Sequence, residues 1–327
     1  MRIPSRVQFL PHFLNLLVTA LALCTPSAHA QPACAGKPVK LFAGFVAGSA
    51  TDTAARILAT RLGPVLGQQA IVENRPGASG AIATEAVATA PADGCTLLFS
   101  SASATVNASA HDNAQTQAWK SLAPVAMVAN VPNILVVHPS LGVKSVRDLI
   151  ALARSRPDAI SYASSGIGTS PHMSAELFDF RAGVKMQHVP YKGSSQAMND
   201  VLSGLVPVMF SPASSVLAHI RAGKLVALAT TSNRRTSLID IPTMEEAGIP
   251  DFNLSIWFGV LAPRGTDTAV VRRLAVAIEK AQDDSRAQFA TQSMEVVKAG
   301  PAEFGAFIDA EIARWGALIK ANNIVIN

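Results

Sequence analysis

The sequence places its densest group of small hydrogen-bond donors in residues 161–172. The stretch SYASSGIGTSPH holds five serine or threonine hydroxyls and two glycines, and the helical segment MSAELFDF follows it. Glycine lets the backbone come close to a ligand, and the first N–H groups of a helix lack partners within that helix. Ser164, Ser165, Gly168 and Thr169 therefore predict a site for a small anion such as a carboxylate.

A similar combination occurs nearer the N-terminus, in the turn GFVAGSATDTAAR over residues 44–56. A strand-like run ends here and a helical pattern begins, so we expect Thr51 or Asp52 to cap the helix. The free N–H groups of the first turn and the helix dipole would favour an anion, while an ordinary strand-to-helix turn is the plainer interpretation. The candidate ligand-binding residues of this turn are Ala47, Gly48, Ser49 and Thr51.

Two further strand ends supply the remaining candidates. Ser100 and Ser101 end the run CTLLFSS, and Phe210 and Ser211 end the run VPVMFS. In open α/β sheets a ligand binds beyond the carboxyl ends of the strands. All four residues are therefore included in the predicted ligand site.

A serine nucleophile in residues 161–170 is the enzymatic alternative. It would need a base and an acid beside the hydroxyl, and neither a G-x-S-x-G elbow nor a phosphate-binding G-x-x-x-x-G-K-[ST] motif is present. His172 can line the cleft, although a hydrogen-bonded helix histidine is the interpretation we favour. We expect no catalysis and no cofactor.

Metal ligands and paired carboxylates are also missing from the pattern. The sequence contains no H-x-H, H-E-x-x-H or C-x-x-C spacing. Its acids are scattered, and none is paired for acid–base work. We therefore expect no metal site.

The composition excludes nucleic acid as a partner. The formal charge of +5 falls to +3 once Arg2 and Arg6 are removed, and the other basic residues form no cluster. Aromatic residues make up 6% of the chain, which argues against base-stacking surfaces. Mild basicity is compatible with a small anionic ligand.

Residues 1–30 have the pattern of a secretory signal peptide. Arg2 and Arg6 precede the apolar run FLNLLVTALALC, and Ala28-His29-Ala30 precedes Gln31. We predict cleavage near Ala30 and an exported, soluble mature chain. A lipoprotein signal ending at Cys24 is the alternative, disfavoured because Leu23 is bulkier than the residue usual before a lipidated cysteine.

The mature chain alternates strand-like and helical runs, which predicts βαβ units with parallel-dominated sheets. Two long extended segments, near residues 123–138 and 254–263, read as crossovers between two α/β lobes. We predict a first lobe of residues 31–129 and 256–327, a second lobe of residues 130–255, and a ligand cleft between them. Beyond the second crossover we expect only helices, over residues 268–282, 285–292 and 302–322.

Cys34 and Cys95 are the cysteines of the mature chain. Each lies at the start of a strand-like run, so parallel neighbouring strands would bring both thiols to one edge of the sheet. An isolated pair in an oxidising compartment favours a disulfide. Two unpaired, partly buried thiols are the alternative.

The chain resembles the substrate-binding components of tripartite tricarboxylate transporters, also called the TctC or Bug family. The resemblance rests on ENRPGASG followed by a helix and PADGCTLLFSS, on GFVAGSATDTAAR, on SSGIGTSPHMSAELF, on VPYKGSSQAMNDVLSGLVPVMF and on WFGVLAPRGT. It covers nearly all of the mature chain. It implies a type II-like, two-lobed periplasmic binding protein that closes on a small carboxylate held by backbone N–H groups and hydroxyls.

Three departures from the family pattern concern the ligand. Gly44 and Ser49 replace a proline and a glycine of the first loop, and Ser211 stands where many members have an aspartate that would suit an ammonium group. The segment NASAHDNAQTQ replaces an N-P-x-L-Y motif. Ser211 in place of the aspartate weakens the case for an amino-acid ligand, whereas the other two departures predict a changed first loop and a changed cleft rim, which weakens ligand assignments taken from relatives.

The resemblance implies a monomer that delivers a small organic acid to membrane permease subunits. An extracytoplasmic sensor that signals ligand binding to a membrane kinase needs the same closure and is the alternative among binding proteins. The sequence leaves the identity of the acid open.

Overall fold

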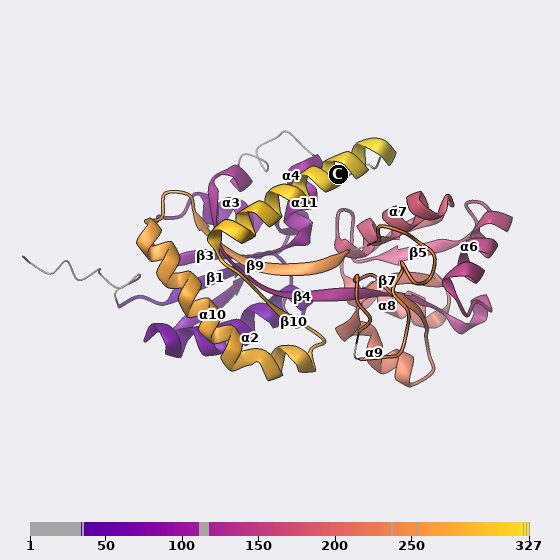
Figure 1. Ribbon diagram of the computed structural model, residues 1–327, viewed down its shortest axis with the longest axis horizontal. Helices are drawn as coiled ribbons and strands as arrows, with labels where there is room; N and C mark the ends of the chain where they lie inside the picture. The colour runs from indigo at the N-terminus through magenta and orange to yellow at the C-terminus, as the bar shows by residue number, and fades with distance from the viewer. Residues whose placement is uncertain are drawn as a thin grey trace, which may run out of the picture.

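The computed structural model describes Cys34 and residues 36–110, 118–236, 238–252, 254–322, 324 and 326. The predicted signal peptide and its cleavage site lie outside the described residues, as does most of the segment NASAHDNAQTQ. Figure 1 shows two α/β lobes side by side, joined by two long strands that run between them. No helix among the described residues is long and apolar enough to cross a membrane.

The first lobe contains a sheet in the order β2-β1-β3-β9-β4, with β10 on β4. Pairs among β1, β2 and β3 are parallel, whereas β9 pairs antiparallel with both β3 and β4. The strands are β1 (Val39–Ala43), β2 (Ala70–Asn74), β3 (Thr96–Ser101), β4 (Leu122–Val137), β9 (Ser255–Pro263) and β10 (Glu295–Ala299).

The second lobe continues the same sheet from the far end of β4, in the order β4-β7-β5-β6, with β8 also on β4. Its strands β5, β6 and β7 are parallel to one another, and β7 and β8 are antiparallel to β4. They span β5 (Ser161–Ser164), β6 (Gln187–Pro190), β7 (Val208–Pro212) and β8 (Val226–Thr230).

Helices cover both faces of this sheet (Figure 1). In the first lobe α10 packs against α2, and α11 packs against α4. The helices are α2 (Ala50–Leu66), α3 (Ala81–Ala88), α4 (Ala102–Ala110), α6 (Val146–Ser155), α7 (Ser170–Ala182), α8 (Ser194–Ser203), α9 (Ala213–Arg221), α10 (Thr268–Thr291) and α11 (Pro301–Asn322), with short 3₁₀ turns η1 (Ala78–Gly80) and η2 (Pro139–Leu141).

The two predicted crossovers are confirmed as β4 and β9. β4 pairs with β9 as far as Pro132 and with β7 from Asn133, so one strand serves both lobes. Every pair that involves β4 or β9 is antiparallel, so the parallel character predicted from the alternation holds for the outer strands only.

The C-terminal region differs from the expectation of helices alone. Residues 268–291 form one continuous helix instead of two. The segment Glu295–Ala299 is a strand, β10, which pairs with β4 around Asn130 and Ala129. The short EVVKA segment forms a strand because it pairs with the edge of β4. This tertiary contact cannot be read from the local sequence pattern.

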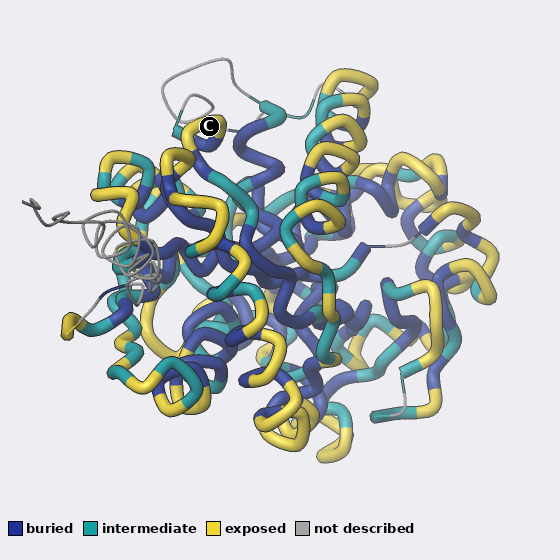
Figure 2. The backbone as a smooth tube through the Cα atoms, turned by 60° about the vertical axis from the view of Figure 1, so that its left-hand side comes forward, coloured by how far each residue is buried: buried dark blue, intermediate teal, exposed yellow. Residues whose placement is uncertain are grey.

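Buried hydrophobic residues form separate clusters, and Figure 2 shows the buried parts of the backbone in dark blue in the interior of the molecule. In the second lobe Tyr162, Phe178 and Phe210 belong to one such cluster. Trp315 and Leu318 near the end of α11 belong to it as well. The end of the last helix therefore shares a buried cluster with the strands and helices of the second lobe.

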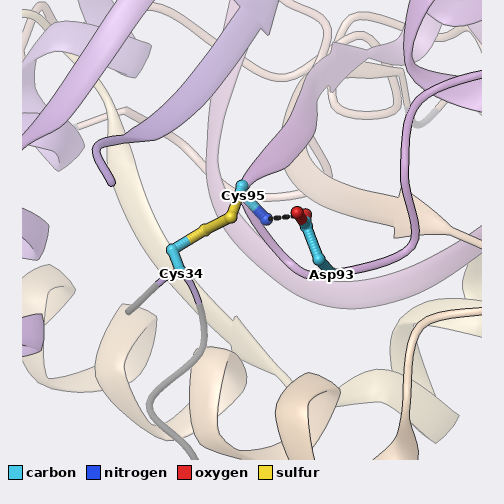
Figure 3. Close-up of side chains that lie close together, drawn as sticks. All are labelled: Cys34, Asp93 and Cys95. Carbon is cyan, nitrogen blue, oxygen red and sulfur yellow. Dashed lines mark hydrogen bonds between the residues drawn. A yellow bond between two sulfur atoms is a disulfide. The ribbon is translucent and has the colours of Figure 1, made fainter. Parts of the chain in front are cut away.

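A disulfide joins Cys34 to Cys95, with their Cα atoms 5.1 Å apart (Figure 3). It links the chain ahead of β1 to the start of β3, which are parallel neighbours in the sheet. Asp93 lies beside it and accepts a hydrogen bond from the Cys95 backbone N–H at 2.8 Å. Both sulfurs are bonded to each other, so this group is a structural link and not a set of metal ligands.

Candidate ligand-binding site

The β1–α2 loop, residues 44–49, is closed by Ser49 and Asp52. The Ser49 side chain caps α2 by accepting from the Asp52 backbone N–H at 3.2 Å, so the expected caps Thr51 and Asp52 were wrong. Ser49 has the extended backbone that an N-cap requires, with φ −69° and ψ 162°. Capping by Ser49 leaves other N–H groups of the first turn of α2 for an external acceptor.

Asp52 is buried and turned toward the loop, where it accepts from the Gly48 backbone N–H at 2.9 Å. Its carboxylate also accepts from Arg56 Nε at 3.0 Å and from Asn74 Nδ2 at 2.8 Å. Burial pushes the pKa of Asp52 upward, but these hydrogen bonds outweigh it and hold the pKa below its ordinary value. The charge that could repel an anion is thus neutralised inside the protein.

The β5–α7 loop, residues 164–169, has the glycine-dependent shape that its sequence suggested. Gly166 and Gly168 have φ of +134° and +73°, which side-chain-bearing residues rarely adopt. Thr169 is the N-cap residue of α7, and its side chain makes no cap bond. The start of α7 therefore presents its first N–H groups beside the loop.

Two of the predicted donor hydroxyls hold this loop together. Thr169 Oγ1 donates to the Gly166 carbonyl at 2.6 Å. Ser164 is fully buried, and its Oγ accepts from the Gly166 N–H at 3.2 Å and lies 2.7 Å from His188 Nε2. Ser165 is partly exposed, and its hydroxyl is the one that the loop leaves for a ligand.

The candidate residues at the ends of β3 and β7 have different surroundings. Ser100 and Ser101 line a cavity of about 10 Å³ together with Gly44 and Ser79, which is the space of about one water molecule. Phe210 instead lies in the core of the second lobe, with its ring 5.9 Å from that of Phe178. Ser211 is also fully buried, and its Oγ has no hydrogen-bond partner among the described residues.

The two lobes touch at the β5–α7 loop, through residues that sequence reasoning missed. Ser79 Oγ of η1 in the first lobe donates to the Ile167 carbonyl in the second at 3.0 Å. Asn107 of α4 donates to the Ala78 carbonyl at 3.2 Å, so α4 supports η1. A side chain at Gly168 would meet Asn107 Oδ1 at 3.2 Å. The sequence feature that could have revealed this contact is the RPGASG loop. This loop is part of the family resemblance, but sequence analysis gave Ser79 no role in the site.

His172 is a buried, hydrogen-bonded helix residue, as favoured. Its Nδ1 accepts from the Gly168 N–H at 3.2 Å, and its Nε2 lies 3.5 Å from Glu176 Oε1. The pairing of Ser164 with His188 does not make a nucleophile, because Ser164 is inaccessible and His188 stacks on the ring of His172. The nearby carboxylate of Glu176 contacts His172 and Tyr162 instead.

A cavity of about 390 Å³ lies between β4, β9, β10 and α11 on one side and residues 232–234 of the second lobe on the other. Its charged residues include Glu311 and Arg314, which pair with each other at 2.6 Å. The Trp315 indole N–H also donates to Glu311 at 3.1 Å. None of the predicted site residues lines this cavity, so it is separate from the β1–α2 and β5–α7 loops.

Comparison with solved structures identifies the class of protein that has this fold. The chain superposes on the R. palustris protein Rpa4515 with adipate at a TM-score of 0.82, with 34% identity, over 89% of this chain and 98% of that one. The periplasmic binding protein BugD superposes at 0.79 with 32% identity, over 88% of this chain and 98% of that one. The fold is that of two-lobed periplasmic binding proteins.

Sequence comparison identifies the family. Residues 54–324 match the model of the tripartite tricarboxylate transporter family receptor. Protein BugT of Bordetella pertussis is 38% identical over 313 residues, which cover 94% of this chain and 95% of that protein. The chain belongs to this receptor family and is a solute-binding protein, and the family's proteins are periplasmic binding proteins.

Proposed function

We propose that this protein captures a small organic acid with at least one carboxylate and delivers it to the membrane permease subunits of a tripartite transporter, without catalysis. The observation that carries the ligand class is the pair of neutral loops, β1–α2 and β5–α7, at the starts of two helices. Rpa4515 is described with adipate, and MatC of Rhodopseudomonas palustris, 26% identical with a TM-score of 0.77 over 87% of this chain and 99% of that one, with malate. These similarities support a dicarboxylate as the solute.

The ligand residues follow from the geometry of the loops. The first turn of α2 supplies backbone N–H groups on one side, while Gly48, whose N–H donates to Asp52, shapes the loop. Ser165 and the first turn of α7 supply donors on the other, while Ser49, Ser164 and Thr169 shape the loops. Neutral donors stabilise an anion without a fixed counter-charge in the site, so the solute can be both bound and released.

The proposal also includes the lobe boundaries, the signal-peptide cleavage site and a monomeric state. Lobe boundaries near residues 130 and 255 are supported by the change of β4 partners between Pro132 and Asn133. Cleavage near Ala30 would release the mature chain, and a monomer is sufficient because both loops come from one chain. Light scattering during gel filtration would measure the mass of the mature protein in solution.

The test is calorimetric titration of adipate, malate and adipamide into the mature protein. We expect a dicarboxylate to bind and adipamide, which has lost both charges, to fail. Ser165→Ala should weaken binding about tenfold, the value of one hydrogen bond to a charged group, and Ser165→Asp should abolish it by placing a negative charge in the loop.

Ser155→Ala is the matched control, because Ser155 is exposed at the end of α6 and donates only to its own helix, at the Leu152 carbonyl. It should bind as the unaltered protein does. Equal affinity for the diacid and the diamide would contradict the carboxylate assignment. Unchanged affinity in Ser165→Asp would show that the solute binds elsewhere.

A further inference from the structure

The ladder between the two crossover strands ends at the pair Pro132 and Ser255. From Asn133 onward β4 pairs with β7 of the second lobe, and Leu254 is the residue immediately before β9. Asn133 and Leu254 are therefore the first residues of the two crossovers on the second-lobe side of their last common pair.

Thr231, which follows β8, bonds to both crossovers at this point. Its backbone N–H donates to the Asn133 carbonyl and its carbonyl accepts from the Leu254 N–H, each at 2.9 Å. Its hydroxyl accepts from the Asn133 N–H at 2.9 Å and donates to the Leu254 carbonyl at 2.5 Å, with the Asn133 carbonyl as a longer alternative at 3.1 Å. All three residues are buried, so water does not compete for these bonds. Thr231 therefore fixes the two crossovers relative to each other.

The side chain of Asn133 connects this point to the start of α7. Its Nδ2 donates to Ser170 Oγ at 2.8 Å and to Ser174 Oγ at 3.0 Å. The two serines are four positions apart, so they lie on the same face of the helix, and Ser170 is the first residue of α7. One amide group of β4 thus spans the first turn of α7, the turn that is proposed to bind the solute carboxylate.

The carboxamide group of Asn133 matches this contact because both of its N–H groups are used. An aliphatic or ionised side chain at this position has no proton to donate to the two hydroxyls. Asn133 Oδ1 has no hydrogen-bond partner among the described residues, although the side chain is fully buried. A buried oxygen without a partner lowers the stability of the folded state, and such a departure from good packing is expected where function requires it.

We propose that Asn133 is a positioning residue for the solute: it links the two crossovers to the first turn of α7, so that the direction of the backbone N–H groups in that turn depends on how the crossovers are held. This inference rests on the proposed function of α7 in binding. Thr231, Asn133 and Ser174 are fully buried. They cannot touch the solute, and they act on its affinity only through the start of the helix.

Amide NMR of the solute-free protein tests this link without a ligand. Thr231→Val removes the hydroxyl that joins the crossovers and keeps the backbone bonds of residue 231. Thr231 has no hydrogen bond to α7 among the described residues. We nevertheless expect the change to shift the amide signals of Ser170 and Ser174, and we expect these shifts to vanish when it is made in an Asn133→Leu background. Unmoved signals in Thr231→Val, or equal shifts in both backgrounds, would overturn the inference.

Calorimetric titration of adipate measures the consequence for binding. In Ser174→Ala the Asn133 amide loses one acceptor, and Asn133→Leu removes both bonds with little change in volume. We expect the affinity to fall about three- to tenfold in the first variant and about ten- to thirtyfold in the second, the effects of one and of two hydrogen bonds. A structural role alone would lower the unfolding temperature and leave the affinity of the folded protein unchanged. Ser174→Ala decides the question if Asn133→Leu does not fold.

Gln282→Met is the matched control. Gln282 is also a buried amide, and its Nε2 donates to the carbonyls of Val128 and Val297 in the first lobe at 2.7 and 2.8 Å. This variant should lose stability and still bind adipate as the unaltered protein does. Unchanged affinity in Ser174→Ala would refute the inference. Failure of every protein to bind adipate or malate would count against the proposed solute class, and the NMR comparison of the solute-free proteins would still decide the role of Asn133.

Discussion

The hydroxyl groups of the β1–α2 and β5–α7 loops differ in whether they hold the loop together or stay exposed. Ser49 caps α2, and Thr169 closes the β5–α7 loop on Gly166. Ser165 keeps its side chain partly exposed. For the proposed site we therefore expect binding to depend chiefly on backbone N–H groups whose direction these side chains fix, so that a change at Ser49 acts through loop shape and a change at Ser165 acts on the contact itself.

Asp179 on α7 predicts how the free energy of unfolding depends on pH. It is buried, its Oδ2 accepts from the Met186 N–H at 2.7 Å, and its Oδ1 has no partner among the described residues. Burial raises its pKa to about 7 despite that hydrogen bond. The folded state thus keeps a proton that the unfolded state releases above about pH 4, and the free energy of unfolding falls as the pH rises from about 4 to about 7.

Asp179→Asn removes this titration and keeps an acceptor for Met186. We expect the variant to be more stable than the unaltered protein at pH 8, by about 1–3 kcal/mol, and equal to it near pH 4. Urea unfolding at both pH values measures the difference. A stability difference of the same size at pH 4 and pH 8 would mean that packing, and not the protonation of Asp179, causes it.

At the scale of elements, the disulfide ties the chain ahead of β1 to the start of β3 across a sequence separation of 61. Closing a loop of this length lowers the entropy of the unfolded chain and contributes about 4 kcal/mol. Replacing Cys34 and Cys95 by serine should lower the free energy of unfolding by about that amount, as measured in urea. The exported, denatured protein should show no free thiol, and two titratable thiols would contradict the link.

The elements also show where sequence reasoning succeeds and where it stops. Strands β1 to β3 and the crossovers were predictable because apolar runs and turn residues are local signals. The strand β10 and the merging of residues 268–291 into α10 were not, since the first depends on a free edge of β4. The stack of the Tyr162, His188 and His172 rings needs the register of β5 against β6, which no spacing in the sequence encodes.

At the scale of the whole molecule, the two lobes are in contact beside the candidate site. Ser79 bonds to Ile167 across the lobes, and the cavity beside Ser100 and Ser101 has the volume of about one water molecule. A solute of several carbon atoms needs more room, so we expect the lobes to separate about β4 and β9 when a solute enters the proposed site.

The bond from Ser79 to Ile167 therefore biases the equilibrium between open and closed forms. Removing its hydroxyl in Ser79→Ala leaves each lobe intact and weakens the closed form alone, so small-angle X-ray scattering of the ligand-free variant should give a larger radius of gyration. The affinity for solute should fall by the same factor as the closed population, about three- to tenfold for one hydrogen bond. Thr89→Ala is the control, because Thr89 also donates to a backbone carbonyl, that of Glu85, but within the first lobe. An unchanged radius together with unchanged affinity in Ser79→Ala would mean that closure is set by contacts elsewhere, such as those of α11.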